Sequence, residues 1–299
     1  MKQIVFEGAA TAIVTPMNDH GVDFEAFSRL IDAQIAAGID ALVVAGTTGE
    51  NATLTDYEHH EVIRFAVEKV DHRVPVIAGT GSNDTAHAVE MTKFAGAAGA
   101  DAVLLVCPYY NKATQRGAVM AFQTIADASP VPCILYNVPS RTGFNLAPQS
   151  VLELSRHPRI VAIKEASGNI SQVAEIARLC GDNLTIYSGN DDQIVPILSL
   201  GGKGVISVLA NVLPGETSRL VHDYLDGRTD EARKAQLHYL PLINALFSEV
   251  NPIPVKAATA AMGFGRNILR LPLCTMDKQL QAHLLELMKA EGISVREDI

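Results

Sequence analysis

The chain has 299 residues, and its 24 Lys and Arg against 33 Asp and Glu give a formal net charge of −9. Neither sign forms a long charge run, so we expect no nucleic-acid partner and no anionic membrane partner. The four cysteines form no CxxC pair, and no apolar stretch approaches the length of a membrane span. This predicts reduced thiols in a cytoplasmic protein without an export signal or a membrane segment.

Short β-branched runs alternate with longer amphipathic stretches along most of the chain. The longer stretches carry one apolar face at the helical period, as in Phe24, Phe27 and Leu30. The expected strands are 11–14, 41–44, 75–78, 102–106, 133–136, 161–164, 185–188 and 204–207. Eight strands that are apolar on both faces, each followed by a helix, are typical of a (β/α)8 TIM barrel in the α/β class. An open doubly wound sheet is the alternative, but the first turn, 15–18, lacks the glycines of a dinucleotide-binding fingerprint.

After about Gly227 the alternation stops, and only helical patterns follow, at 230–247, 254–262 and 278–288. No low-complexity segment or long linker separates them from the preceding part. The sequence therefore predicts a catalytic barrel over residues 1–227 and a small C-terminal helical domain over residues 228–299.

Lys164 ends the sixth expected strand, directly after the apolar run 160–163. Burial at such a strand end removes water from the ammonium and lowers its pKa toward the range in which a free amine attacks a carbonyl. The structural alternative is a lysine that reaches solvent or pairs with Glu165. Active sites of this fold lie at the carboxyl ends of the strands, so Lys164 would share one barrel mouth with five polar or glycine-bearing loops. These loops are 46–50, 79–81, 108–111, 136–143 and 188–190.

Each of these loops also has a structural alternative. Thr47 and Thr48 fit either a helix cap or a carboxylate site. Arg141 fits either a solvated loop charge or bidentate carboxylate recognition. For Tyr109 and Tyr110, composition alone favours packing at the barrel rim or at an interface over a role in catalysis.

Several kinds of chemistry have no signature in this sequence. There is no HExxH or GxSxG motif, and the nine histidines form no ligand cluster. Pyridoxal phosphate would need a phosphate site at the barrel mouth, whereas the glycine-rich segment 201–204 precedes the last strand. We therefore expect no metal and no cofactor, and a lysine imine formed directly with a carbonyl substrate remains.

Taken together, six segments resemble the dihydrodipicolinate synthase family, also called 4-hydroxy-tetrahydrodipicolinate synthases, within the pyruvate-dependent class I lyases. The resemblance covers nearly the whole chain, and the double tyrosine and the Pro-Ser-Arg-Thr-Gly continuation are its most specific parts. The segments are Gly46-Thr47-Thr48-Gly49-Glu50, Pro108-Tyr109-Tyr110-Asn111, Tyr136-Asn137-Val138-Pro139-Ser140-Arg141-Thr142-Gly143, Ile163-Lys164-Glu165-Ala166, Gly204-Val205-Ile206-Ser207-Val208 and Asn251-Pro252-Ile253-Pro254-Val255-Lys256.

The resemblance implies that Lys164 forms a Schiff base with pyruvate. The enamine then attacks the aldehyde of aspartate 4-semialdehyde to give 4-hydroxy-tetrahydrodipicolinate, in the diaminopimelate route to lysine. It assigns proton transfer to Tyr136, with Thr47 and Tyr110 as further members of a hydroxyl relay. In such enzymes the tyrosine that matches Tyr110 enters the site of a neighbouring subunit. The resemblance therefore also implies a homo-oligomer, typically a tetramer built as a dimer of tight dimers.

The same resemblance assigns the binding residues. Thr48 and the backbone of Ile206 match the positions that hold pyruvate, and Arg141 matches the group that receives the carboxylate of the semialdehyde. Family members that lysine inhibits bind it at the tight-dimer interface. The counterparts of that effector site here are Asn51, Ala52, Asp56, His59, Asn83, His87 and Tyr109.

His87 departs from this pattern, because lysine-sensitive members carry a glutamate at its position. A histidine cannot replace the carboxylate that faces the effector's ammonium, so we expect weak or absent lysine inhibition. Two other functions stay open from the sequence: a sister lyase acting on N-acetylneuraminate or a keto-deoxy sugar acid, and a catalytically silent binding barrel. Arg141 favours a small dicarboxylate-like partner over a polyol, and the intact set of Lys164, Tyr136, Tyr110 and Thr47 argues against a silent barrel.

Overall fold

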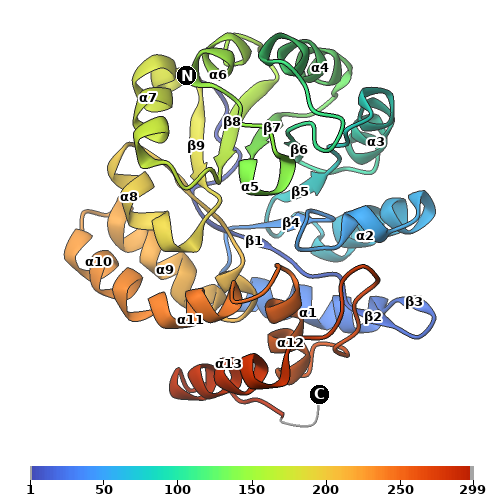
Figure 1. Ribbon diagram of the computed structural model, residues 1–299, viewed down its shortest axis with the longest axis vertical. Coiled ribbons are helices and arrows are strands. Elements are labelled where there is room, and N and C mark those ends of the chain that lie inside the picture. Colours follow the sequence, from blue (N-terminus) through green and yellow to red (C-terminus); the bar gives the residue numbers. More distant parts are fainter. Residues whose placement is uncertain (1, 297–299) are drawn as a thin grey trace.

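The computed structural model describes residues 2–296, and its central feature is a closed barrel of eight parallel strands. The strands are β1 (Gly8–Ala12), β4 (Ala41–Val44), β5 (Val76–Gly79), β6 (Ala102–Val106), β7 (Cys133–Asn137), β8 (Ile160–Glu165), β9 (Thr185–Ser188) and β10 (Gly204–Ser207). They neighbour one another in chain order, and β1 closes the barrel by pairing with both β4 and β10. Helices surround them (Figure 1), which confirms the predicted (β/α)8 architecture.

The surrounding helices are α1 (Phe24–Ala36), α2 (Asp56–Val70), α3 (Thr85–Ala97), α4 (Gln115–Ala128), α6 (Pro148–Leu154), α7 (Ile170–Cys180), α8 (Ile194–Ser199) and α9 (Pro214–Leu225). Several begin where the sequence supplies an acceptor for the first turn. Side chains of Asp23, Thr55, Asp84, Thr114 and Asn169 accept backbone N–H hydrogen bonds there. The loops contain the hairpin β2 (Met17–Asn18) and β3 (Gly21–Val22), the short helix α5 (Pro139–Thr142), and the 3-10 turns η1 (Asn51–Thr53), η2 (Gly181–Asn183), η3 (Asp191–Gln193) and η4 (Leu209–Asn211).

The first strand lies earlier than the sequence pattern predicts, at Gly8–Ala12 and not at 11–14. Its glycine has low strand propensity, but a Cβ at Gly8 would lie 2.1 Å from Oδ2 of Asp40, so only glycine fits there. The paired strand β10 is equally constrained. A side chain at Gly204 would place its Cβ 2.0 Å from the carbonyl oxygen of Gly8. Tertiary packing therefore overrides propensity here.

The C-terminal part contains α10 (Thr229–His238), α11 (Leu240–Leu246), α12 (Ile253–Ala261) and α13 (Lys278–Ala290). The single helix predicted over 230–247 is wrong, because Pro241 stands in the first turn of α11 and the chain breaks before it. Helices α11 and α12 pack against α13, and Figure 1 shows this group along one side of the barrel. The boundary after residue 227 stays a prediction, since α10 packs directly against α8 and α9.

One end of the barrel is closed by packing. Phe6 stacks on Tyr187 with 4.3 Å between ring centroids, and the Tyr187 hydroxyl donates a 2.8 Å hydrogen bond to the Phe6 carbonyl. The strands begin at this end, so the opposite mouth is left for a site. The four cysteines are free thiols, three of them buried. Within residues 2–296 no helix is both long and apolar enough to cross a membrane.

Candidate active site

Lys164 points into the barrel near its open mouth and is 6 % exposed. Its ammonium nitrogen lies 4.3 Å from the ring centroid of Tyr136, whose Cα is paired with that of Lys164 across β7 and β8. Burial lowers the pKa of Lys164 to about 7; the nearby Asp191 carboxylate opposes this shift and Arg141 adds to it. A substantial fraction of this amine is therefore unprotonated at neutral pH.

Glu165 does not pair with this lysine. Successive strand residues face opposite sides, and the Glu165 carboxylate accepts hydrogen bonds from the Asn137 amide at 3.1 Å and from the Ser167 backbone N–H at 2.7 Å. Among residues 2–296 the Lys164 ammonium has no ion-pair partner. The structural alternative of a Lys164–Glu165 pair is thus wrong.

Tyr136 and Thr47 lie together beside the lysine. Tyr136 is 7 % exposed, and burial raises the pKa of its phenol, while the Arg141 charge and a side-chain hydrogen bond with Thr47 lower it. A buried phenol with a hydroxyl partner can hold and pass a proton between substrate atoms. The structure therefore brings Lys164, Tyr136 and Thr47 into one group.

Tyr110 is not part of this group within a single chain. Its side chain is 91 % exposed, and its backbone has a positive φ of 65°. The preceding Tyr109 is half-buried and lines the cavity at the mouth. A fully exposed tyrosine beside a site is suited to contact with another molecule.

Asn251 joins the two side chains expected to recognise carboxylates. Its side-chain Nδ2 donates a 3.0 Å hydrogen bond to the Thr48 hydroxyl, and its backbone carbonyl accepts a 3.0 Å hydrogen bond from Arg141. Its own Oδ1 is buried and has no partner among the described residues. Ile206 is fully buried on β10 and faces the barrel interior. Sequence reasoning quoted the segment 251–256 but missed Asn251 as a member of the site.

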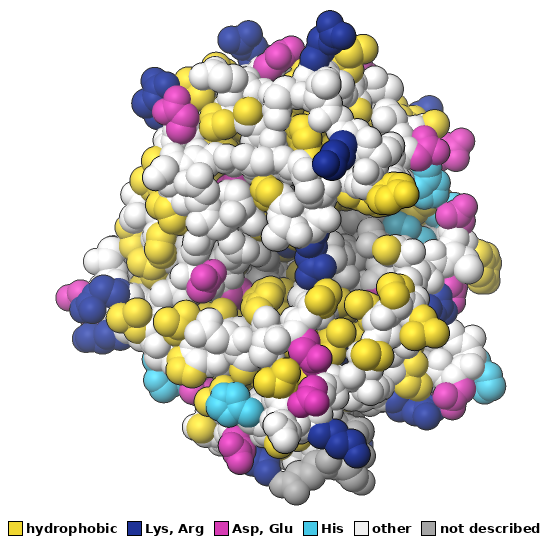
Figure 2. Space-filling view, viewed as in Figure 1, with side chains coloured by type: hydrophobic (Ala, Val, Ile, Leu, Met, Phe, Trp, Pro, Cys, Tyr) yellow, Lys and Arg dark blue, Asp and Glu magenta, His cyan; other side chains and the backbone are white. Residues whose placement is uncertain are grey.

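A cavity of about 220 Å³ opens at this mouth, where Figure 2 shows a hollow in the face of the molecule. Its lining includes Thr47, Tyr136 and Arg141, and also Asn51, Ala52 and Tyr109 from the expected effector site. The other expected effector residues lie in the adjacent loops and helices. His59 Nε2 is 2.8 Å from the Gly79 carbonyl, Asn83 donates to the Tyr109 carbonyl at 3.3 Å, and His87 Nε2 is 3.9 Å from the Asp56 carboxylate.

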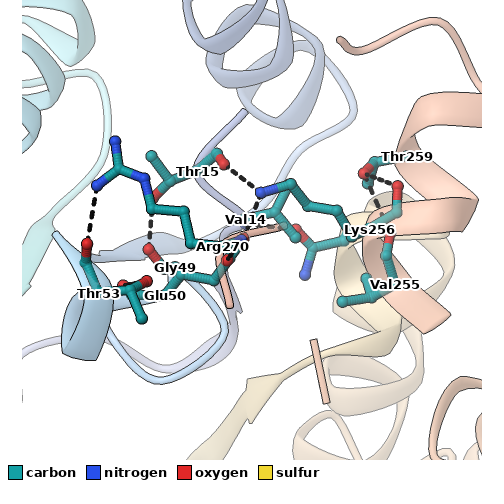
Figure 3. A network of polar contacts seen from close by, with 10 residues as sticks. Val14, Thr15, Gly49, Glu50, Thr53, Val255, Lys256, Thr259 and Arg270 are labelled. Atoms are coloured by element: carbon teal, nitrogen blue, oxygen red, sulfur yellow. Dashed lines mark hydrogen bonds and ion pairs between the residues drawn. The ribbon is translucent and has the colours of Figure 1, made fainter. Parts of the chain in front are cut away.

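A second buried lysine, Lys256, contacts the loop 46–50 that carries Thr47 and Thr48 (Figure 3). Lys256 of α12 lies 2.5 Å from the Glu50 carboxylate and donates a 2.6 Å hydrogen bond to the Thr15 carbonyl. The backbone N–H of Arg270 donates to the other Glu50 oxygen at 3.2 Å. The C-terminal helices thereby fix the turn that carries Thr47 and Thr48. Sequence reasoning missed this pair, because 206 residues separate its members.

In the part of the chain that the structure describes, no group of three or more His, Cys, Asp or Glu side chains could hold a metal ion. The chemistry available at the mouth is that of an amine of lowered pKa, a phenol, two threonine hydroxyls and a guanidinium. This set lies at the carboxyl ends of the strands, where enzymes of the (β/α)8 class have their active sites.

A sequence model described as the dihydrodipicolinate synthetase family matches residues 5–291. The 4-hydroxy-tetrahydrodipicolinate synthase of Caldicellulosiruptor saccharolyticus is 54 % identical over 294 residues, which cover 98 % of this chain and 99 % of that one. The chain therefore belongs to the dihydrodipicolinate synthetase family, which confirms the resemblance. It is an enzyme, so the alternative of a silent barrel does not hold.

Solved structures agree with this assignment. A dihydrodipicolinate synthase from Aquifex aeolicus has a TM-score of 0.96 and 41 % identity, covering 98 % of this chain and 100 % of that one. The chloride-inhibited synthase from Acinetobacter baumannii, crystallised with pyruvate, has a TM-score of 0.94 and 40 % identity, covering 96 % and 99 %. The similarity thus extends over fold and sequence together.

Proposed function

We propose that the chain condenses pyruvate with aspartate 4-semialdehyde through an imine on Lys164, giving 4-hydroxy-tetrahydrodipicolinate in the cytoplasmic diaminopimelate route to lysine. The observation that carries this proposal is the buried, unpaired Lys164 at the barrel mouth, whose pKa is lowered to about 7. The name of the C. saccharolyticus relative and the pyruvate bound to the A. baumannii enzyme support the choice of substrates.

The reaction begins when the free amine of Lys164 attacks the ketone of pyruvate. Water leaves, and the cationic iminium nitrogen then accepts electrons far better than the ketone oxygen did. This makes loss of a methyl proton easier, and the resulting enamine carbon attacks the aldehyde. Tyr136 lies 4.3 Å from the amine, measured from its ring centroid, and takes and returns the protons of these steps.

The binding roles are assigned to Arg141, which lines the cavity, and to Thr48 and Ile206, which lie outside its lining. Thr48 and the backbone at Ile206 hold the carboxylate of pyruvate, and Arg141 receives the carboxylate of the semialdehyde. Asn251 keeps Thr48 and Arg141 at a fixed separation through its two 3.0 Å hydrogen bonds. Two carboxylate receptors held by one residue suit two small acids.

Tyr110 completes the relay from a second copy of the chain. Its 91 % exposure leaves it free to enter a neighbouring site, so Thr47 and Tyr136 would work with Tyr110 of the partner subunit. The active form is then a homo-oligomer, a tetramer made of two tight dimers. The expected effector residues Asn51, Ala52, His59, Asn83, His87 and Tyr109 would lie beside the same tight interface.

The test of substrate choice is a comparison of turnover by the purified chain. Pyruvate plus aspartate semialdehyde is expected to react with a kcat/KM well above that of N-acetylneuraminate or keto-deoxy sugar acid cleavage. Arg141→Leu serves as the matched variant, because it removes the proposed carboxylate receptor and leaves Lys164 in place. It is expected to raise the KM for the semialdehyde more than that for pyruvate. Faster cleavage of N-acetylneuraminate by the unmodified chain would contradict the proposal.

A further inference from the structure

Asp191 is a buried carboxylate that the mechanism above does not use. It stands in η3 directly beyond the end of β9 and is 2 % exposed. Its Oδ2 accepts the backbone N–H groups of Val208 at 3.0 Å and Leu209 at 2.9 Å. Its Oδ1 is buried and, among residues 2–296, has no hydrogen-bond partner. A buried carboxylate oxygen without a partner is costly, so it calls for an explanation.

The Lys164 side chain passes Gly189, two residues before Asp191. Strand β9 lies beside β8, with Tyr187 opposite Lys164. A Cβ added to Gly189 would lie 3.1 Å from both Cγ and Cε of Lys164, so the lysine crosses the chain just before Asp191. The same Cβ would lie 2.7 Å from Cβ of Ala166, so glycine leaves room at this position for both neighbours.

The charged and titratable groups around the ammonium come from three elements. They are Tyr136 on β7, Arg141 on α5 and Asp191 in η3. Glu165 faces away from the barrel interior, and Tyr187 is directed to the Phe6 carbonyl at the closed end. Burial raises the pKa of the Asp191 carboxyl, whereas hydrogen bonds from Ser207 and from the Leu209 and Val208 backbone, and the charge of Lys164, lower it. In its ionised form Asp191 supplies the negative charge that acts on Lys164, and Arg141 supplies a positive charge of the same sign as the ammonium.

The charges of Asp191 and Arg141 matter most when the imine forms, because the imine is a cation. A neutral amine and a ketone combine with one proton to give a cationic C=N bond, and the ketone oxygen leaves as water. The product carries a positive charge at the buried Lys164, where the charge of the exposed Arg141 already acts. Without an opposite charge such a cation is unfavourable in a medium of low dielectric constant.

We propose that Asp191 is a positioning residue that acts through Lys164: its buried carboxylate is the counter-charge of the iminium, with the unpartnered Oδ1 free to face it. This inference rests on the proposed Schiff-base function. The two backbone hydrogen bonds to Oδ2 hold the charge in place, and they also order the segment that follows Ile206. Charge and scaffolding can be separated, because an asparagine oxygen can accept both N–H groups but carries no charge.

The test compares Asp191→Asn with Asp192→Asn. Asp192 is the next residue in the same turn and is exposed, so its variant changes the net charge equally at almost the same place. The first readout is the titration of the Lys164 ε-carbon by NMR with ¹³C-labelled lysine, assigned with Lys164→Arg. The second is the pyruvate concentration that gives half-maximal borohydride trapping at a fixed pH.

In Asp191→Asn the Lys164 resonance is expected to titrate lower by about one pH unit, since an opposite charge within a few ångströms shifts a pKa by that order. At the same time half-maximal trapping is expected to need about ten-fold more pyruvate. A scaffolding role alone would not lower the pKa while weakening the imine. Asp192→Asn should match the unmodified chain in both readouts, and Asp191→Glu should restore most of the trapping.

Wild-type titration and trapping in a folded Asp191→Asn would overturn the inference. If that variant does not fold, Asp191→Ser gives the same comparison with a smaller acceptor. Failure of the unmodified chain to trap pyruvate on Lys164 at all would refute the proposed function itself. The two failures are therefore distinguishable.

Discussion

Lys164 and Lys256 are both buried, but a carboxylate contacts the ammonium of Lys256 and an aromatic ring lies beside that of Lys164. Lys256 is 1 % exposed and has a carboxylate oxygen of Glu50 at 2.5 Å and a carbonyl oxygen at 2.6 Å. Lys164 is 6 % exposed and has an aromatic ring beside it but no direct ion pair among residues 2–296. Burial lowers the pKa of both, and for Lys256 the adjacent carboxylate opposes that shift.

The comparison shows what makes a buried lysine reactive. A direct carboxylate opposes loss of the proton from Lys256, and the contact connects α12 to the loop at Glu50 (Figure 3). Lys164 has only a more distant charge, so its amine can lose the proton near neutral pH and attack a carbonyl. The same side chain therefore serves structure in one place and chemistry in the other.

Lys164→Arg gives the largest expected effect on activity. Arginine keeps a positive charge but cannot form the imine, so turnover should fall by more than about 10⁴-fold. Thermal unfolding should change little, and steady-state rates and a melting curve measure the two. Retention of more than a tenth of the activity would be incompatible with a covalent role for Lys164.

Lys256→Met should lower stability more than it lowers activity. It leaves the Glu50 charge buried without its partner, which costs about 3–5 kcal/mol in the free energy of unfolding. Denaturant titration at fixed protein concentration measures the loss, and the double variant Lys256→Met with Glu50→Gln should recover a large part of it. Equal stability of the single variant and the unmodified chain would show that Lys256 does not stabilise the fold through Glu50.

Tyr136→Phe tests the aromatic residue beside Lys164. It keeps the packing beside Lys164 but removes the hydroxyl that transfers protons, so kcat should fall about 10²- to 10³-fold. Borohydride trapping of pyruvate should be slower but still occur on Lys164. An unchanged kcat would show that another group moves the protons.

The pH dependence follows from the sign of the Lys164 shift. Below a pKa of about 7 the amine is protonated and unreactive, so the trapping rate should fall about ten-fold per pH unit there and level off above about pH 8. Trapping rates at fixed pyruvate from pH 5 to 10 measure this profile. A rate that keeps rising toward pH 10, the range of an ordinary lysine, would contradict the lowered pKa.

A free lysine molecule gives the smallest expected effect. Its ammonium needs a carboxylate, as Lys256 needs Glu50, but at the expected effector site Asp56 lies 3.9 Å from His87 Nε2 and is largely exposed. Turnover should therefore stay unchanged at sub-millimolar lysine. His87→Glu supplies the missing carboxylate and should introduce inhibition, whereas clear inhibition of the unmodified chain would refute the expectation.

The periodic parts of the sequence predict most of the fold, and the strand ends predict where Lys164, Tyr136 and Thr47 meet. The glycine- and alanine-rich β1 escapes such reasoning, because the contacts that require glycine at positions 8 and 204 are made with Asp40 and across the β1–β10 pair. Asp191 and Asp192 are indistinguishable in the sequence, yet one is buried and the other exposed. Contacts between residues far apart in the chain decide such cases, and no local pattern records them.

Borohydride reduction in the presence of pyruvate, followed by peptide mass mapping, tests the central claim most directly. We expect one reduced pyruvate adduct per chain, on Lys164, with Lys256 unmodified as a second buried lysine that serves as an internal control. An adduct on Lys256, on exposed lysines only, or on none would contradict the account.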